Sequence, residues 1–223
     1  MTDVITKTAG NDDPMLNAEE ARVLGVLMEK RRTTPDNYPL TLNSLVQGCN
    51  QKSSRAPVMR LEAGQVGHVI NLLRDRNLVY AELSSRAERY GHKLAGALEL
   101  DQQEQALMCM LMLRGPQTPG ELRSHSARLA EFADLAAVQD ALDLLMAREP
   151  PLVKRLPRES GRREERFAHL LCGDVEVEAA PAGMVPAEDA RIEALEQELG
   201  RLRAELEVLW RLTGLEDQRP DGR

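Results

Sequence analysis

One five-residue pattern occurs twice in the sequence, as ERYGH at residues 88–92 and as ERFAH at residues 165–169. Each copy follows a short apolar-rich segment, at residues 78–83 and 152–156, with a polar, charged loop between the two. Two short strands joined by a polar loop form a β-hairpin. The sequence therefore predicts two hairpins, one in each half of the chain.

Three predicted helices precede each hairpin. The first helix of each copy begins with a capping box, in which Asn17 pairs with Glu20 and Asp101 with Glu104. The second helices start at Leu42 and at Thr118–Pro119, and the third cover residues 62–76 and 135–148. The apolar positions of the third helices match at a constant offset, Val66, Val69, Ile70 and Leu73 against Val138, Ala141, Leu142 and Leu145.

Three short helices followed by a hairpin is the element order of a winged helix. We therefore expect a mainly α protein with small β-hairpins (α+β), made of two tandem winged-helix domains at residues 16–98 and 99–172. Residues 1–15 are expected to form a disordered tail. A single all-helical bundle is the alternative, and it does not account for the paired hairpins.

A heptad pattern marks residues 187–213, between a linker at 173–186 and a second expected tail at 214–223. The pattern predicts an amphipathic, coiled-coil-like helix. We expect this helix either to form the seam of a homodimer or to pack back onto its own domains. The seam positions are Ile192, Leu195, Leu199, Leu202, Leu206 and Leu209.

Composition excludes several classes of protein. The longest apolar run, residues 106–113, is too short to cross a bilayer, and the N-terminus has no signal-peptide pattern. Three widely spaced cysteines indicate neither a disulfide framework nor a metal site, which favours a cytoplasmic protein. The net charge is −7, but residues 16–100 hold 12 Lys and Arg against 9 Asp and Glu. A mildly basic first domain permits contact with nucleic acid.

Longer stretches resemble the YceH-like family of bacterial proteins of unknown function. They are MEK (28–30), TTP (33–35), YPL (38–40), CNQK (49–52) with Arg55 and PV (57–58), LRGPQTPGELR (113–123) and ERFAHL (165–170). The resemblance covers about residues 16–171. It implies a tandem winged-helix fold, and it implies no established activity.

The turn between the second and third helices of the first domain is the strongest surface candidate. Lys52 and Arg55 are expected to neutralise phosphates, with Asn50 and Gln51 donating hydrogen bonds. The alternative is a polar turn in which Asn50 satisfies local backbone groups.

The third helix of the first domain is the expected recognition helix. Its outward positions are Gln65, His68, Asn71 and Arg74, residue types that read base edges in the major groove. In the second domain, Asp140 and Asp143 are expected to face outward, where they would repel phosphate. The alternative is that both helices serve packing or protein contact.

The second wing carries a basic cluster that would lie over a phosphate backbone. Its candidates are Arg155, Arg158, Arg162 and Arg163, and the alternative is a solvated loop with internal ion pairs. His92 and His169 are expected to be structural. Cys49 has no recognisable base for nucleophilic catalysis, and no cofactor motif is present.

Two functions remain open, and neither is enzymatic. The first is a DNA-binding, regulatory protein that acts on double-stranded DNA through its first domain and wings. The second is a protein-interaction adaptor that uses the second domain and the C-terminal helix.

Overall fold

The computed structural model describes residues 14–83, 87–157 and 164–174. These residues belong to one compact unit, and they form a mixed α+β fold of helices and small antiparallel sheets. The heptad helix predicted at 187–213, its seam residues, the flanking segments from residue 175 on and residues 1–13 lie outside the described residues. No helix within the described ranges is long and apolar enough to span a bilayer.

The first half of the unit runs from α1 to β3. Helix α1 (Ala18–Thr33), a 3-10 turn (Pro35–Asn37), β1 (Leu40–Thr41), α2 (Leu42–Cys49) and α3 (Ala63–Asp75) precede a hairpin of β2 (Val79–Leu83) and β3 (Glu88–His92). The strands form one antiparallel sheet in the order β1-β3-β2, in which Tyr90 lies opposite both Leu40 and Ala81. The hairpin predicted from the first five-residue pattern is confirmed.

The second half repeats this order after the short helix α4 (Leu94–Ala97). It consists of α5 (Gln102–Arg114), α6 (Pro119–Ser126), α7 (Leu135–Met146) and a hairpin of β4 (Val153–Leu156) and β5 (Arg166–His169). An isolated bridge between Gln117 and Phe167 stands where the first half has β1. The predicted order of three helices and a hairpin therefore occurs twice, with a reduced sheet in the second half.

The predicted capping boxes are confirmed. The Glu20 amide donates to the Asn17 side chain over 2.9 Å, and the Glu104 amide donates to Asp101 over 2.8 Å. Thr118 caps α6 in the same way, with Pro119 in its first turn. Each cap satisfies amide groups that have no partner within the helix, so the N-termini of these three helices could be predicted from the local sequence.

The third helices end earlier than predicted. Helix α7 stops at Met146 rather than at residue 148, and Arg148 turns back to the start of α5, where its Nη2 lies 3.0 Å from Glu104 Oε2. Arg76, the C-cap of α3, makes the matching ion pair with Glu20 over 3.2 Å. In both halves, an arginine after the third helix therefore binds the capping-box glutamate of the first.

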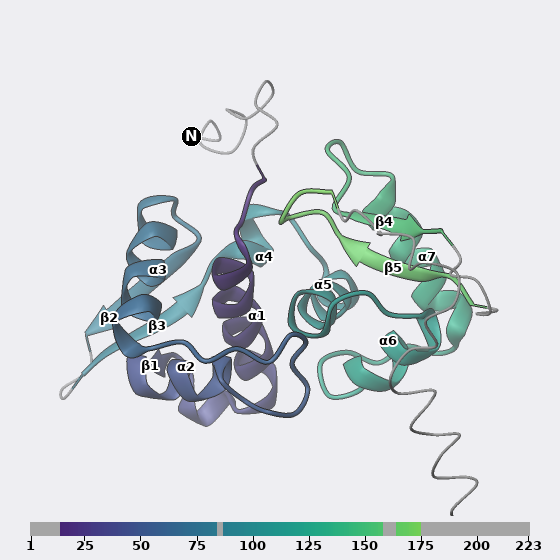
Figure 1. Ribbon diagram of the computed structural model, residues 1–223. Coiled ribbons are helices and arrows are strands. Elements are labelled where there is room, and N and C mark those ends of the chain that lie inside the picture. The colour runs from purple at the N-terminus through teal and green to yellow at the C-terminus, as the bar shows by residue number, and fades with distance from the viewer. Residues whose placement is uncertain (1–13, 84–86, 158–163, 175–223) are drawn as a thin grey trace, which may run out of the picture. The chain divides into compact units, whose positions relative to one another are not determined.

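Helices α1 and α5 lie side by side and join the two halves (Figure 1). Nearly every residue of α1 from Glu20 to Met28, and of α5 from Ala106 to Leu113, is buried in a core that extends through both halves. A glycine makes the approach possible, because a Cβ on Gly25 would lie 2.8 Å from Leu113 Cδ2. The long apolar run of residues 106–113 is explained by this double burial.

Candidate nucleic-acid interface

The junction loop, residues 50–57 between α2 and α3, lies against both α1 and α5. The buried guanidinium of Arg22, on α1, donates to the carbonyl oxygens of Cys49 (3.0 Å) and Pro57 (2.6 Å) at the two ends of the loop. The Ala56 amide donates to the Leu113 carbonyl of α5 over 2.8 Å. The loop thus connects the two halves, which the predicted turn alone did not indicate.

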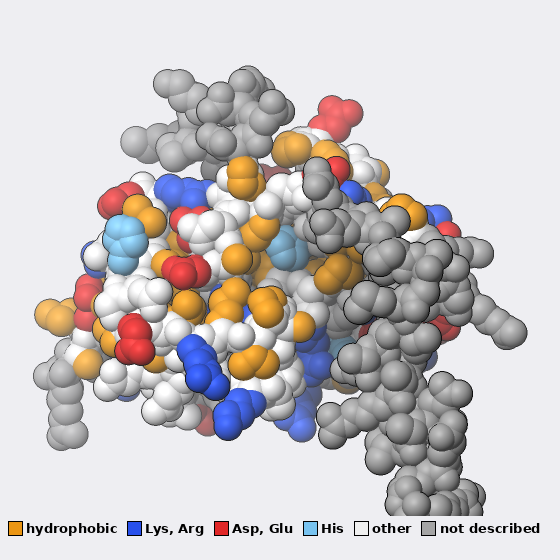
Figure 2. Space-filling view, in the orientation of Figure 1, with side chains coloured by type: hydrophobic (Ala, Val, Ile, Leu, Met, Phe, Trp, Pro, Cys, Tyr) orange, Lys and Arg blue, Asp and Glu red, His pale blue; other side chains and the backbone are white. Residues whose placement is uncertain are grey.

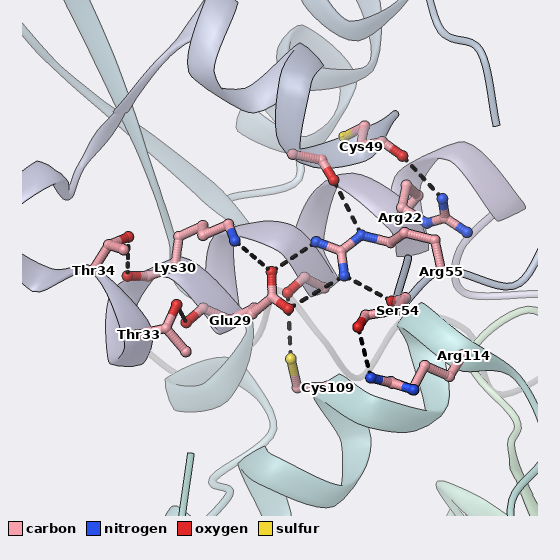
Figure 3. Close-up of polar contacts among 12 residues, drawn as sticks. Arg22, Glu29, Lys30, Thr33, Thr34, Cys49, Ser54, Arg55, Cys109 and Arg114 are labelled. Atoms are coloured by element: carbon pink, nitrogen blue, oxygen red, sulfur yellow. Dashed lines mark hydrogen bonds and ion pairs between the residues drawn. The ribbon is translucent and has the colours of Figure 1, made fainter. Parts of the chain in front are cut away.

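Arg55 is buried rather than presented to solvent (Figure 3). Its Nη1 and Nη2 donate to the two carboxylate oxygens of Glu29, at 3.2 and 2.7 Å, and its Nε donates to the Gly48 carbonyl at 3.0 Å. Burial raises the pKa of Glu29, but the hydrogen bonds and charge of Arg55 and Lys30 outweigh it and hold that pKa below its usual value. The expectation that Arg55 meets a phosphate is wrong in this structure, because its side chain is 0% exposed.

Asn50 follows the alternative given for this turn. Its side-chain amide donates to the Leu61 carbonyl (2.8 Å) and accepts from the Leu61 amide (2.7 Å), so it fixes the end of the loop. Gln51 is partly exposed and Lys52 is exposed. Of the four candidates in the turn, Lys52 is the cation that remains accessible.

Arg114, at the end of α5, was not among the predicted site residues. Its Nη2 donates to Ser54 Oγ over 2.7 Å, and its Nε is buried without a hydrogen-bond partner in the described part of the chain. Burial, followed by the neighbouring charge of Arg55, lowers the pKa of Arg114. Sixty residues separate Ser54 from Arg114, so local sequence patterns give no signal for this contact.

The outward face of α3 is polar and open. Gln65, His68 and Asn71 are exposed as predicted, and the side-chain oxygen of Gln65 accepts a hydrogen bond from the Glu62 amide at the start of the helix. A Cβ added at Gly64 or Gly67 would meet nothing within 4 Å. This face therefore lets another surface approach the helix backbone closely.

Arg74 lies at the edge of the same helix. It is exposed, but it forms an ion pair with Glu88 of β3 over 3.5 Å. An exposed pair of this kind is weak, about 0–1 kcal/mol, so Arg74 can exchange its partner for a phosphate at small cost.

The second wing is described in part. Arg155 pairs with Glu165 (3.2 Å) and lies 3.9 Å from Asp143, and its guanidinium carbon is 5.6 Å from the Phe167 ring centre. These contacts agree with the alternative of a loop with internal ion pairs. Arg158, Arg162 and Arg163 lie outside the described residues.

His92 and His169 are both largely buried at the bases of the hairpins, with Nδ1 atoms that have no partner among the described residues. Burial lowers the pKa of each imidazole to about 4, so both rings are neutral at pH 7. The ring of Tyr38 contacts the ring of His92 edge-on, and the Tyr38 hydroxyl accepts a hydrogen bond from the backbone amide of His92. These surroundings support the structural role predicted for both histidines.

The thiols of Cys49 and Cys109 are poorly placed for chemistry. Burial raises the pKa of Cys49 to about 12, and it raises that of Cys109, whose Sγ donates to the Gly25 carbonyl. A thiol that stays protonated at neutral pH is a poor nucleophile.

Comparison with known proteins gives a consistent family. Residues 16–162 match DUF480, described as a protein of unknown function. A UPF0502 protein of Mesorhizobium japonicum is 46% identical over 204 residues, which are 89% of this chain and 98% of the relative. A UPF0502 protein of Burkholderia multivorans is 51% identical over 191 residues, 84% of this chain and 81% of the relative. Another, from Vibrio parahaemolyticus, is 47% identical over 204 residues, 87% of this chain and 94% of the relative.

Proposed function

Because the chain belongs to the DUF480 family of proteins of unknown function, we propose its function from its fold and surface. We propose that it is a non-enzymatic protein that binds double-stranded DNA through two winged-helix halves. The order of its helices and strands supports this proposal. Each half has three main helices followed by a hairpin, and in the first half the order β1-β3-β2 places the hairpin beside the short strand between the first two helices.

The single observation that carries the proposal is the outward face of α3. His68 and Asn71 stand one turn apart on it, both exposed, and neither makes a hydrogen bond within the described residues. An asparagine amide matches the N6 and N7 edge of adenine, and a major groove accepts a helix with a small-residue surface. Gly64 and Gly67 give α3 such a surface at its N-terminal end.

The two halves differ at these positions, which assigns the contact to the first. At the offset that aligns Val66 with Val138, His68 and Asn71 correspond to Asp140 and Asp143, and both aspartates are exposed. Carboxylates facing a groove are repelled by phosphates. The second half is thus the part that faces away from DNA or contacts it only through its wing.

A mobility-shift titration with genomic DNA fragments, repeated across salt concentrations, tests the proposal. Binding through phosphates makes the logarithm of affinity fall linearly with the logarithm of salt concentration. The double variant H68A/N71A is expected to weaken binding by about tenfold or more, since one good base contact contributes about 1–3 kcal/mol. The matched control is D140A, at the position equivalent to His68.

Absence of binding at about 50 mM salt, where phosphate contacts are strong, would refute DNA binding. Equal affinities of the wild type and H68A/N71A would reject α3 as the reading helix.

A second candidate is the adaptor function, favoured by the outward face of α7. Leu144 is 59% exposed there, beside Asp140 and Asp143, whose carboxylates are unfavourable for contact with DNA. An exposed leucine among carboxylates is better suited to a protein surface than to DNA. Affinity purification of the full chain, with and without Leu144→Asp, tests this: a protein partner lost from the variant supports an adaptor, and unchanged recovery of every co-purified protein opposes it.

A further inference from the structure

Three arginines and one glutamate come together at the junction of the halves. Arg22, Arg55 and Arg114 come from α1, the junction loop and α5, and Glu29 is the acid among them (Figure 3). Glu29 is occupied, because Arg55 binds both its oxygens and Lys30 lies 3.0 Å from one of them. Neither Arg22 nor Arg114 has a carboxylate within ion-pair distance in the described ranges, and each holds a buried Nε without a partner.

The junction therefore has an excess of positive charge in a partly desolvated place. Burial and the charge of Arg55 lower the pKa of both Arg22 and Arg114, which expresses the same electrostatic cost. A buried charge without a counter-ion is unfavourable, and an anion at the surface next to it relieves that cost. Arg22 is engaged with loop carbonyls, so Arg114 is the group whose exposed edge can meet an anion.

The backbone of the junction loop adds donors beside Arg114. The amides of residues 51–55 make no hydrogen bond to any acceptor in the described parts of the chain. Ser54 has a left-handed φ of 61°, and a turn of this kind can direct successive amides toward one anion. Ser53 and Lys52 are exposed at its outer side.

We infer that the junction loop and Arg114 together bind a phosphate group. The amides of the turn and the hydroxyls of Ser53 and Ser54 are donors, and Lys52 and Arg114 supply positive charge. Arg55 does not touch the phosphate. It neutralises Glu29, a carboxylate that would otherwise repel the anion.

The site stands independently of the proposed DNA function. A phosphate group reaches it either as part of a DNA backbone or as a small phosphate ester, since the donors recognise only the oxyanion. In Figure 2, Lys and Arg side chains gather along the lower edge of the displayed face, in the region of α2 and the junction loop. A basic surface there raises the local concentration of either source.

Calorimetric titration of the full chain with inorganic phosphate, against chloride at equal ionic strength, tests the inference. We expect saturable binding with a dissociation constant on the order of 1 mM. R114Q and K52Q should each weaken it by about tenfold, as expected for loss of a charge-assisted contact. R60Q is the matched control, because Arg60 is exposed and forms no ion pair within the described residues, and it should bind phosphate as the wild type does.

K52Q changes an exposed side chain, so it remains informative if R114Q does not fold. No saturable phosphate binding by the wild type, or equal binding by wild type and K52Q, would overturn the site. Loss of phosphate binding together with weaker DNA binding in K52Q supports the site and assigns its phosphate to DNA. Loss of phosphate binding with DNA binding unchanged or absent supports a small phosphate ester.

Discussion

Arg55 and Glu29 form a two-point ion pair, with Nη2 2.7 Å from Oε2, in which the arginine side chain is fully buried and the glutamate side chain is 13% exposed. The pair fixes the junction loop to α1, 26 residues away in the chain. Two charges removed from water in this way stabilise the fold only as long as both are present.

The first prediction concerns this pair. E29Q leaves the buried Arg55 without its counter-charge, so it should lower the free energy of unfolding by about 3–5 kcal/mol. Urea denaturation followed by circular dichroism measures the loss, and the control is E149Q, at an exposed glutamate. A loss within the error of the E149Q value would mean that the pair contributes no net stability.

The second prediction concerns the crossing of α1 and α5. G25A places a methyl group 2.8 Å from Leu113 Cδ2, and overpacking of this kind costs about 1–3 kcal/mol. The matched control is G67A, inside α3, where the added Cβ meets nothing within 4 Å. There alanine should stabilise the helix by up to about 1 kcal/mol. In thermal denaturation, the melting temperature should fall for G25A and rise for G67A. A higher melting temperature for G25A would contradict the close approach of α1 and α5.

The third prediction compares two capping-box glutamates. Glu104 is buried and paired with Arg148, whereas Glu121 performs the same capping role on α6 while exposed. Loss of an exposed cap costs about 1 kcal/mol, so E121A should have an effect of that size. E104A also leaves Arg148 unpaired, so it should lower the free energy of unfolding by about 1–2 kcal/mol more than E121A does. Equal urea midpoints for the two variants would show that the Arg148 contact is not stabilising.

The fourth prediction is a loss of stability in mild acid. The pKa of His92 and of His169 is about 4 in the folded chain, against an ordinary value of 6.5. Between pH 6.5 and pH 4 the unfolded chain therefore binds more protons than the folded chain. The stabilising contribution of the neutral histidines should be fully present above about pH 6.5. The free energy of unfolding should fall as the pH drops toward 4, by at most about 3 kcal/mol for each histidine.

Melting temperature measured from pH 7 to pH 4 checks this. H92Q and H169Q should flatten the dependence, while H68Q, at an exposed histidine, should leave it as in the wild type. A pH dependence that is unaltered in H92Q and H169Q would assign the acid sensitivity to other groups.

Features that depend on neighbours in sequence were predictable. The caps at Asn17, Asp101 and Thr118 and both hairpins follow from short local patterns, and the structure contains all of them. The exposed positions of α3 also followed, because helical periodicity separates a buried face from an open one.

The error at Arg55 has a physical origin. A polar turn rich in amides and cations is typical of a surface, and nothing within the turn indicates that Glu29 reaches it from α1. A usable signal lay elsewhere: Arg22 interrupts an apolar run of α1, and Glu29 follows two turns later on the same side. Two charges on one buried stripe of a helix require polar partners from another segment.

The contact between α1 and α5 has a further consequence for symmetry. Gly25 and Cys109 occupy equivalent positions, each eight residues after the N-cap of its helix, and the Cys109 thiol lies 3.3 Å from the Gly25 carbonyl. A position that touches its own counterpart lies on or near a twofold axis, as in an isologous dimer interface. The crossing of α1 and α5 thus brings equivalent positions of the two halves into contact, as the centre of a symmetric homodimer interface does. Because both copies lie in one chain, they can carry different residues at matched positions, as they do at His68 and Asp140.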